Sequence, residues 1–290
     1  MRYLAIGHVC KDLTPTGWTF GGTAAYSART ARAIGCDVHV VTSTGADIDP
    51  RVALPDIDVA NSPAERSTTF ENIYSPEGRV QMLHGVANRL DTHLAKLIDK
   101  PAAAIDIVHL APIAQEVDRA WLDHFRSSFI GITPQGWMRQ WDKSGRVSPA
   151  DWTLAEAVLR RATAAVTSIE DVRGDEFLIK QWAKWARVLV VTRGAKGCSV
   201  YYDGVITDLP AIKVDVVDET GAGDVFAAAF FVRLKQTASP IAAARFANCM
   251  AGKSITRPGL DGVPSQTEIQ QCLQTSPLTE AKYPLKSASH

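Results

Sequence analysis

The chain has 290 residues, 46% of them hydrophobic and 21% charged, so it can bury a sizeable core and disorder is not its default state. Lysine plus arginine and aspartate plus glutamate number 31 each, and the resulting formal net charge of zero removes the electrostatic basis expected of a nucleic-acid binder. The apolar run at the N-terminus is too short for a signal peptide, and no run approaches a membrane span. We therefore expect no nucleic-acid partner, no membrane contact and a cytoplasmic location.

Short apolar runs rich in β-branched residues alternate with helical patterns along the chain. Strands are expected at residues 3–7, 38–43, 105–110, 129–133, 164–168 and 188–192, and helices at 23–34, 154–161 and 174–185. Apolar strands separated by helices predict an α/β fold with a mainly parallel central sheet flanked by helices. No repeat or low-complexity linker interrupts the pattern, so we expect one domain over 1–275 and a polar C-terminal tail over 276–290.

One segment departs from this alternation. Residues 65–86 alternate polar and apolar side chains around the turn Ser75-Pro76-Glu77-Gly78, which is typical of a β-hairpin with one wet face. Such a hairpin either covers an active site as part of a small β lid or adds an antiparallel edge to the sheet. We predict a lid, with strands at about 12–20 and 65–86.

The cysteines form no recognisable pattern. There are five of them, an odd number, and no C-x-x-C pair occurs. This predicts reduced thiols rather than a disulfide framework or a zinc site. The five residues are Cys10, Cys36, Cys198, Cys249 and Cys272.

The segment 218–224 (DETGAGD) carries the strongest chemical signal, because an almost wholly apolar run, typical of a buried helix, follows it. The start of a helix leaves backbone N–H groups unpaired and carries partial positive charge, which suits a phosphoryl group. Gly221 and Gly223 let the main chain approach such an anion closely. Asp224 would lie in the first helical turn, where a carboxylate can take a proton from an attacking hydroxyl. The segment therefore predicts phosphoryl transfer to a hydroxyl.

This segment resembles the second signature, D-x-x-G-A-G-D, of the ribokinase-like (PfkB) carbohydrate kinases. Residues 21–28 (GGTAAYSA) resemble the first signature, and the similarity runs in family order from about Tyr3 to Pro264. The resemblance implies a ribokinase-like fold and transfer from ATP, with Mg²⁺, to a small sugar or cyclic polyol. The wider pattern is similar to a bacterial subgroup near the inositol kinases. Dependence on a monovalent cation stays open.

The resemblance also implies roles for individual residues. Asp224 would be the general base, and the anion hole would consist of Gly221, Ala222 and Gly223. The residues expected to bind the substrate are Asp12, Gly21, Gly22, Tyr26 and Arg139. The residues expected to bind the nucleotide are Thr192, Gly194, Gly197 and Asn248. The magnesium ion would be held through water by Glu170 or Asp171, and the choice between these two acids stays open.

The chain departs from the family pattern on the substrate and magnesium side. Tyr26 stands where many members have asparagine, so the usual ribose contact is in doubt. The family element N-x-x-E appears as residues 168–171 (SIED), without the asparagine. Arg139 either reaches a phosphate or the substrate, or packs at the surface on Trp137 or Trp141.

Two other readings of the sequence remain. In a nucleoside kinase, Tyr26 would stack on a base, and a non-catalytic binding or regulatory relative would have kept the fold and lost turnover. A dinucleotide-binding dehydrogenase is excluded, because no G-x-G-x-x-G follows the first strand. Since relatives dimerise through the lid, the apolar residues of the 65–86 hairpin also allow a homodimer.

Overall fold

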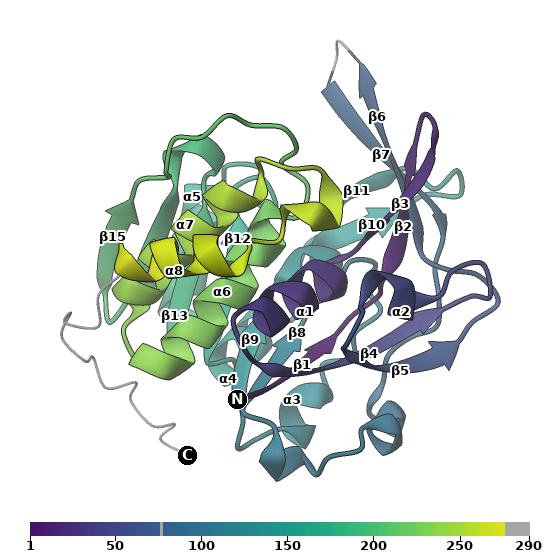
Figure 1. The fold of residues 1–290 in the computed structure, drawn as a ribbon, viewed down its shortest axis with the longest axis horizontal. Coiled ribbons are helices and arrows are strands. Elements are labelled where there is room, and N and C mark those ends of the chain that lie inside the picture. Colours follow the sequence, from purple (N-terminus) through teal and green to yellow (C-terminus); the bar gives the residue numbers. More distant parts are fainter. Residues whose placement is uncertain (76–77, 276–290) are drawn as a thin grey trace.

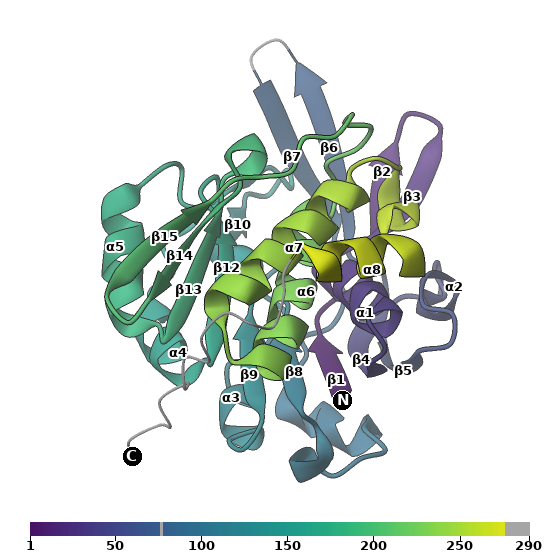
Figure 2. The ribbon, with the colours of Figure 1, turned by 60° about the vertical axis from the view of Figure 1, so that its left-hand side comes forward.

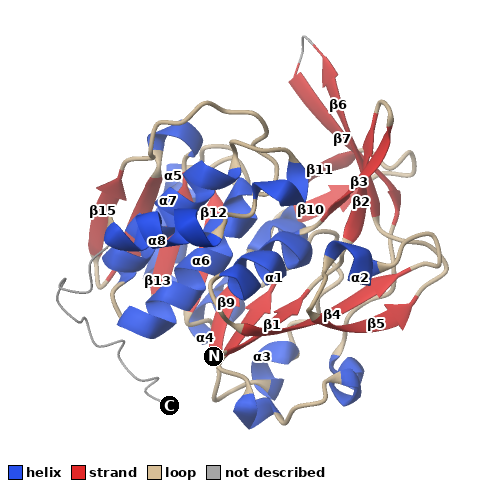
Figure 3. Cartoon of the chain, in the orientation of Figure 1, coloured by secondary structure: helices blue, strands red, loops and turns tan. Residues whose placement is uncertain are grey.

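The computed structural model describes residues 1–75 and 78–275. The described chain is built around one nine-stranded sheet (Figures 1 and 3), which is parallel except for the antiparallel pairs β13–β14 and β14–β15 at one edge. In spatial order the strands are β15 (Val205–Leu209), β14 (Cys198–Tyr202), β13 (Val188–Thr192), β12 (Ala164–Ser168), β9 (Phe129–Ile132), β8 (Ile107–Leu110), β1 (Arg2–Ile6), β4 (Asp37–Thr44) and β5 (Asp58–Pro63).

Helices cover both faces of the sheet, and an apolar cluster lies on each face. Successive side chains of a strand point to opposite faces, so each strand contributes to both clusters. In β1, Tyr3 and Ala5 belong to one apolar cluster, while Leu4 and Ile6 belong to the other. The first cluster is covered by α1 (Thr23–Ala33), α6 (Ala222–Thr237), α7 (Pro240–Ser254) and α8 (Gln266–Gln274) (Figure 2). The second cluster is covered by α3 (Trp121–His124), α4 (Ala155–Arg161) and α5 (Glu176–Trp185).

Helix α6 is the buried helix that the apolar run predicts. Every residue from Val225 to Leu234 is buried, because α6 packs against α1, α7 and the strands β8 and β12. None of the helices in residues 1–75 and 78–275 has the length and apolar character that crossing a membrane requires. The remaining short helical elements are α2 (Pro50–Ala53), η1 (Thr92–Leu97), η2 (Ala102–Ala104), η3 (Pro134–Met138), η4 (Gly194–Lys196) and η5 (Gly259–Gly262).

A second, four-stranded sheet projects from one end of the body (Figure 1). Its spatial order is β3 (Gly17–Gly21), β2 (Cys10–Thr14), β6 (Thr69–Ser75) and β7 (Gly78–Gly85). It contains both segments predicted for the lid, and we call it the lid sheet; the predicted turn residues Pro76 and Glu77 lie outside the described residues. A two-stranded sheet of β10 (Arg139–Trp141) and β11 (Val147–Pro149) lies beside β7.

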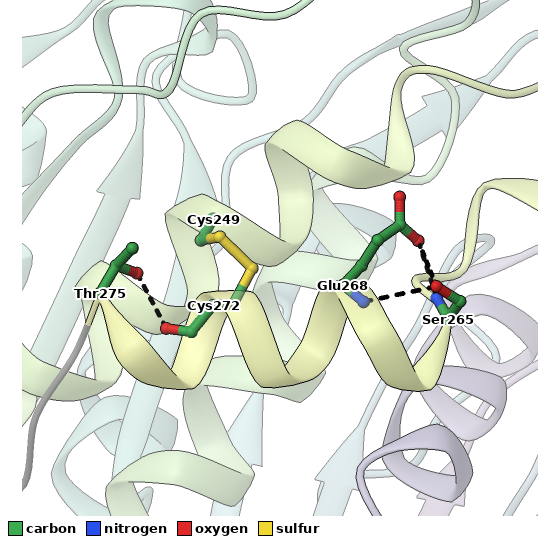
Figure 4. The surroundings of a disulfide bond; sticks show 5 residues. All are labelled: Cys249, Ser265, Glu268, Cys272 and Thr275. Carbon is green, nitrogen blue, oxygen red and sulfur yellow. Dashed lines mark hydrogen bonds between the residues drawn. A yellow bond between two sulfur atoms is a disulfide. The ribbon is translucent and has the colours of Figure 1, made fainter.

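The prediction of five reduced thiols is wrong at two positions. Cys249 of α7 and Cys272 of α8 form a disulfide, 23 residues apart in sequence (Figure 4). The other three cysteines are free and buried. Helix α8 begins with a capping box, in which Ser265 and Glu268 satisfy each other's backbone N–H groups. The bridge and the cap together fix the C-terminal helix on the body.

Candidate active site

The 218–224 segment forms a tight turn at the start of α6. Gly221 is the N-cap residue and has a left-handed backbone (φ 77°), and its carbonyl accepts hydrogen bonds from the N–H groups of Asp224 (3.0 Å) and Val225 (2.9 Å). A side chain at Gly223 would meet nothing within 4 Å, because Gly223 faces open space. This open space lies at the start of α6, where the first N–H groups of a helix have no partner within the helix; the N–H of Ala222 donates to the carbonyl of Glu219 (3.2 Å).

Asp218 holds this turn from its other end. Its Oδ1 accepts a hydrogen bond from the N–H of Thr220 (2.9 Å), and its Oδ2 accepts one from the N–H of Gly259 (2.8 Å) in η5. Burial acts to raise the pKa of Asp218, but these hydrogen bonds outweigh it and hold the pKa below its usual value. Asp218 is thus an ionised acid that holds the turn in place.

Asp224 lies in the first turn of α6, half-buried beside the N-terminus of α1. Burial raises its pKa from the usual 3.8 to about 7, and the nearby carboxylates of Asp171 and Asp12 act in the same direction. A hydrogen bond from the Thr23 side chain and the charge of Arg139 act to lower it. A carboxyl group that titrates near neutrality is well matched to general-base work.

Thr23 was not among the residues predicted from the sequence. It is the first residue of α1 and is only 3% exposed, so its hydroxyl needs a buried partner, which the carboxylate of Asp224 provides. The available signal was a hydroxyl directly after the glycine pair of the first signature.

The predicted substrate residues gather around the junction between the lid sheet and the body. Asp12 lies on β2, and a Cβ at Gly21 would lie only 1.9 Å from Asp12 Oδ2, so the absence of a side chain at Gly21 makes room for this carboxylate. Gly22 is the N-cap of α1 with φ 95°, and a Cβ there would overlap the carbonyl of His8. The glycine pair therefore permits the lid, the acid and the helix start to meet closely.

Arg139 lies between the lid sheet and the base rather than on a surface tryptophan. Its Nη1 donates a hydrogen bond to the carbonyl of Ile113 (3.0 Å), and its guanidinium carbon lies 5.4 Å from the ring centre of the lid residue Phe70. Its positive charge acts to lower the pKa of both the Asp224 carboxyl group and the Cys10 thiol. Trp137, the alternative partner, instead stacks on Trp152.

Tyr26 is buried beside the anion turn and is only 3% exposed. Its pKa is raised far above the usual value. Burial is the largest cause, and the negative charges of Asp224, Asp12 and Asp218 add to it. The phenol is consequently neutral at any pH at which the protein is studied.

The predicted nucleotide residues form a second group at the ends of β13 and β14. Gly194 (φ 54°) is open to solvent, and Gly197 (φ 90°) passes so close to the carbonyl of Leu209 that a Cβ would lie 2.0 Å from it. The carbonyl of Thr192 accepts a hydrogen bond from the N–H of Ile169 (3.0 Å), which links this turn to the acids of 168–171. A hollow of about 400 Å³ opens beside the turn. Arg193 and Lys196 line it, together with residues of β14 and β15.

Asn248 is 8% exposed, and its amide is turned toward the protein. Its Nδ2 donates to the carbonyls of Leu209 (3.4 Å) and Pro210 (3.3 Å) and to the sulfur of Cys198 (3.5 Å). This amide therefore fixes the loop that leaves β15, so any effect on a nucleotide would pass through that loop.

The two acids considered for magnesium differ in their surroundings. Asp171 accepts hydrogen bonds from Gln135 (2.9 Å), from the hydroxyl of Thr167 (3.2 Å) and from the N–H of Ser168 (2.9 Å). Glu170 is exposed, and no hydrogen bond to its carboxylate is found among the described residues. Within residues 1–75 and 78–275 no group of three or more His, Cys, Asp or Glu side chains is arranged to hold a metal ion by itself. Of the two acids, Glu170 has the exposed carboxylate, which a magnesium ion bound through water would require.

Comparison with known proteins agrees with this geometry. Residues 162–267 match the model of the pfkB family carbohydrate kinases. A cytidine kinase of Thermococcus kodakarensis is 28% identical over 252 residues, which cover 78% of this chain and 86% of that protein. A pyrophosphate-dependent kinase of the ribokinase family, solved with a pyrophosphate analog and myo-inositol, superposes with a TM-score of 0.76 at 21% identity, covering 93% of this chain and all of that one. The ribokinase of Thermotoga maritima superposes with a TM-score of 0.72 at 20% identity, covering 94% and 99%. Residues 162–267 therefore carry a domain of the pfkB family of carbohydrate kinases, and the chain as a whole has the ribokinase-like fold.

Proposed function

We propose that this kinase transfers the terminal phosphoryl group of ATP to a hydroxyl of a small sugar or cyclic polyol. The observation that carries the proposal is the arrangement at the start of α6, where the carboxyl group of Asp224, whose pKa burial raises to about 7, directly follows a glycine turn that faces open space. A base and an anion site in one helical turn are what phosphoryl transfer to a neutral hydroxyl needs.

In this mechanism Asp12 accepts hydrogen bonds from hydroxyl groups of the acceptor and so orients it under the lid sheet. Asp224, held by Thr23, takes the proton of the attacking hydroxyl as the new O–P bond forms, while the bond from the terminal phosphorus to the bridging oxygen breaks and ADP leaves. The N–H groups of Gly221, Ala222 and Gly223 stabilise the negative charge on the transferred phosphoryl oxygens. Arg139 adds positive charge close to the same point.

On the donor side, the turn of Thr192, Gly194 and Gly197 would contact the nucleotide, and Asn248 would support the loop beside it. Magnesium would neutralise charge on the donor phosphates, with Glu170 as the nearby acid that acts through water. The lid sheet would keep bulk water from the donor, so that ATP is not lost to hydrolysis.

Two charged side chains near Asp224 support the proposed acceptor class. One carboxylate at Asp12 and one guanidinium at Arg139 suit a compact polyhydroxylated molecule. The cytidine kinase relative and the myo-inositol complex of the structural neighbour represent two different acceptors, a nucleoside and a cyclic polyol. Tyr26 is too buried to offer a ring face to a base, which favours the polyol or sugar.

The test is a steady-state assay of the purified chain with Mg²⁺ and ATP against myo-inositol, ribose, fructose and cytidine. Product is identified by mass spectrometry, and pyrophosphate replaces ATP in a parallel series. We expect an acceptor-dependent phosphorylated product from a sugar or polyol, at least a thousandfold loss in Asp224→Asn, and a raised acceptor KM in Asp12→Asn.

Each contrary outcome has a definite meaning. Turnover of cytidine alone would replace the proposed acceptor by a nucleoside, and turnover with pyrophosphate alone would replace the donor. Binding of the panel without any product, or equal rates in wild type and Asp224→Asn, would refute the mechanism and favour a non-catalytic relative.

A further inference from the structure

The ring of Tyr26 lies directly against the anion turn. It stands in the first turn of α1, and a Cβ placed on Gly221 would lie 2.3 Å from both Cδ1 and Cε1 of the ring. The Cα of Gly221 therefore packs on the tyrosine face without space for any side chain between them. Gly223, two residues further on, meets nothing within 4 Å, so the contact is specific to the N-cap of α6.

The far end of Tyr26 reaches the other segment that shapes the turn. Its hydroxyl oxygen lies 3.9 Å from the position a Cβ would take on Gly259. The N–H of Gly259 donates to Asp218, whose second oxygen accepts the N–H of Thr220. One aromatic ring thus spans both the helix N-cap and the η5 segment that ties down the beginning of the turn.

This placement leaves no exposed ring for a ligand. Tyr26 is 3% exposed and belongs to the same apolar cluster as Val225 and Phe226, the residues that follow the base. Stacking on a nucleobase needs a free aromatic face, and none is available here.

Glycine adopts left-handed and right-handed backbone conformations with similar ease, so sterics of its own do not hold Gly221 in one of them. Packing against a neighbouring side chain can select one conformation, and a catalytic group must be held within a fraction of an ångström. We propose that Tyr26 is a positioning residue, whose ring holds Gly221 in its left-handed conformation so that the N–H groups of the turn face the transferred phosphoryl group. The inference rests on the proposed function, because it assigns the turn to the phosphoryl group.

The experiment compares Tyr26→Phe, Tyr26→Leu and Tyr26→Met with a matched control, Phe246→Leu. Phe246 is a fully buried ring of the same apolar cluster, but it lies on α7 and contacts Arg233 rather than the turn. Steady-state kcat and both KM values are measured on folded protein, with an acceptor that the wild type phosphorylates. Inhibition by MgADP with aluminium fluoride, a mimic of the transferring phosphoryl group, is measured in parallel.

Tyr26→Phe keeps the ring and is expected to retain kcat within about twofold. Tyr26→Leu is expected to lose roughly 10- to 100-fold in kcat and a similar factor in affinity for the fluoride complex, with the acceptor KM within about threefold. Phe246→Leu is expected to lower thermal stability and to leave kcat and the affinity for the fluoride complex unchanged. If Tyr26→Leu does not fold, Tyr26→Met, which fills more of the space, is expected to lose at least fivefold in kcat.

Three results would overturn the inference. The leucine and methionine variants could retain wild-type kcat, Phe246→Leu could lose kcat equally, or the acceptor KM could rise more than tenfold at unchanged kcat. The last result would make Tyr26 a substrate contact. A wild-type protein that phosphorylates no acceptor refutes the proposed function instead, and so the two failures are distinguishable.

Discussion

The raised pKa of Asp224 makes a prediction about stability that does not depend on knowing the substrate. The carboxyl group has a pKa of 3.8 in an unfolded chain and of about 7 in the folded protein, because burial disfavours its charged form. As the pH rises from 4 to above 7, the unfolded chain releases this proton more readily than the folded one. The folded state consequently loses stability over that range.

The magnitude follows from the two values. A pKa difference of about 3 units corresponds to ~4 kcal/mol of lost stability at pH 8 and ~2 kcal/mol at pH 5, as an upper limit. Asp224→Asn has nearly the same shape, can still accept the hydrogen bond from Thr23, and removes the buried charge. We therefore expect the variant to be inactive, yet more stable than the wild type by ~2–4 kcal/mol at pH 8 and by about half as much or less at pH 5.

The assay is urea unfolding at pH 8 and pH 5, without ligands, followed by circular dichroism. Asp218→Asn is the matched control of opposite sign, because Asp218 accepts two backbone N–H bonds and its pKa lies below the usual value. The stability that Asp218 contributes is present above its unfolded pKa and is lost as the pH falls, so its substitution should destabilise the protein at pH 8. An Asp224→Asn variant with no gain at pH 8, or with an equal gain at both pH values, would contradict the reasoning.

Three further predictions concern the surroundings of the site. Thr23→Val removes the hydrogen bond that lowers the pKa of Asp224, so the half-maximal point of kcat/KM against pH should move from near 7 upward by roughly one unit, as a pH–rate profile would reveal. Replacing both Cys249 and Cys272 by serine should lower the free energy of unfolding by ~3 kcal/mol in the chain-entropy model, and reductant should destabilise the wild type but not this variant. Asn248→Ala releases the loop carbonyls that it holds and should raise the donor KM several-fold with little change in kcat, as initial rates would show.

The fold was predictable wherever the information was local. Apolar strand runs and the buried helix after Gly221 lie where the sequence places them, because a strand buried on both faces and a buried helix need apolar residues throughout. The hairpin of β14 and β15 was missed although its turn, Asp203-Gly204 with positive φ at both residues, is a strong hairpin signal. The strand Val205–Leu209 was obscured because Thr207 and Asp208 interrupt its apolar residues, and at this sheet edge only Leu209 is buried.

The candidate site was predictable in its residues but not in its contacts. The signatures identify Asp224 and the glycine turn, and their roles stay predictions until they are assayed. The hydrogen bond from Thr23 to Asp224 and the Cys249–Cys272 bridge depend on how helices pack after folding, and neither follows a spacing rule. The depth of Tyr26 could not be read from its sequence position either, because an aromatic residue near a glycine pair suits a ligand contact and a core contact equally.

The order of strands in the central sheet has a consequence for how the protein is made. β1, the first strand synthesised, is an interior strand of the sheet between β4 and β8, and α1 packs against α6, which begins at Ala222. Contacts between such distant parts of a chain form late, because long loops must close first. A growing chain that ends before α6 carries Asp12 and the lid sheet but lacks Asp224 and the turn at Gly221. If the proposed function holds, the residues proposed to bind the acceptor leave the ribosome well before the proposed base.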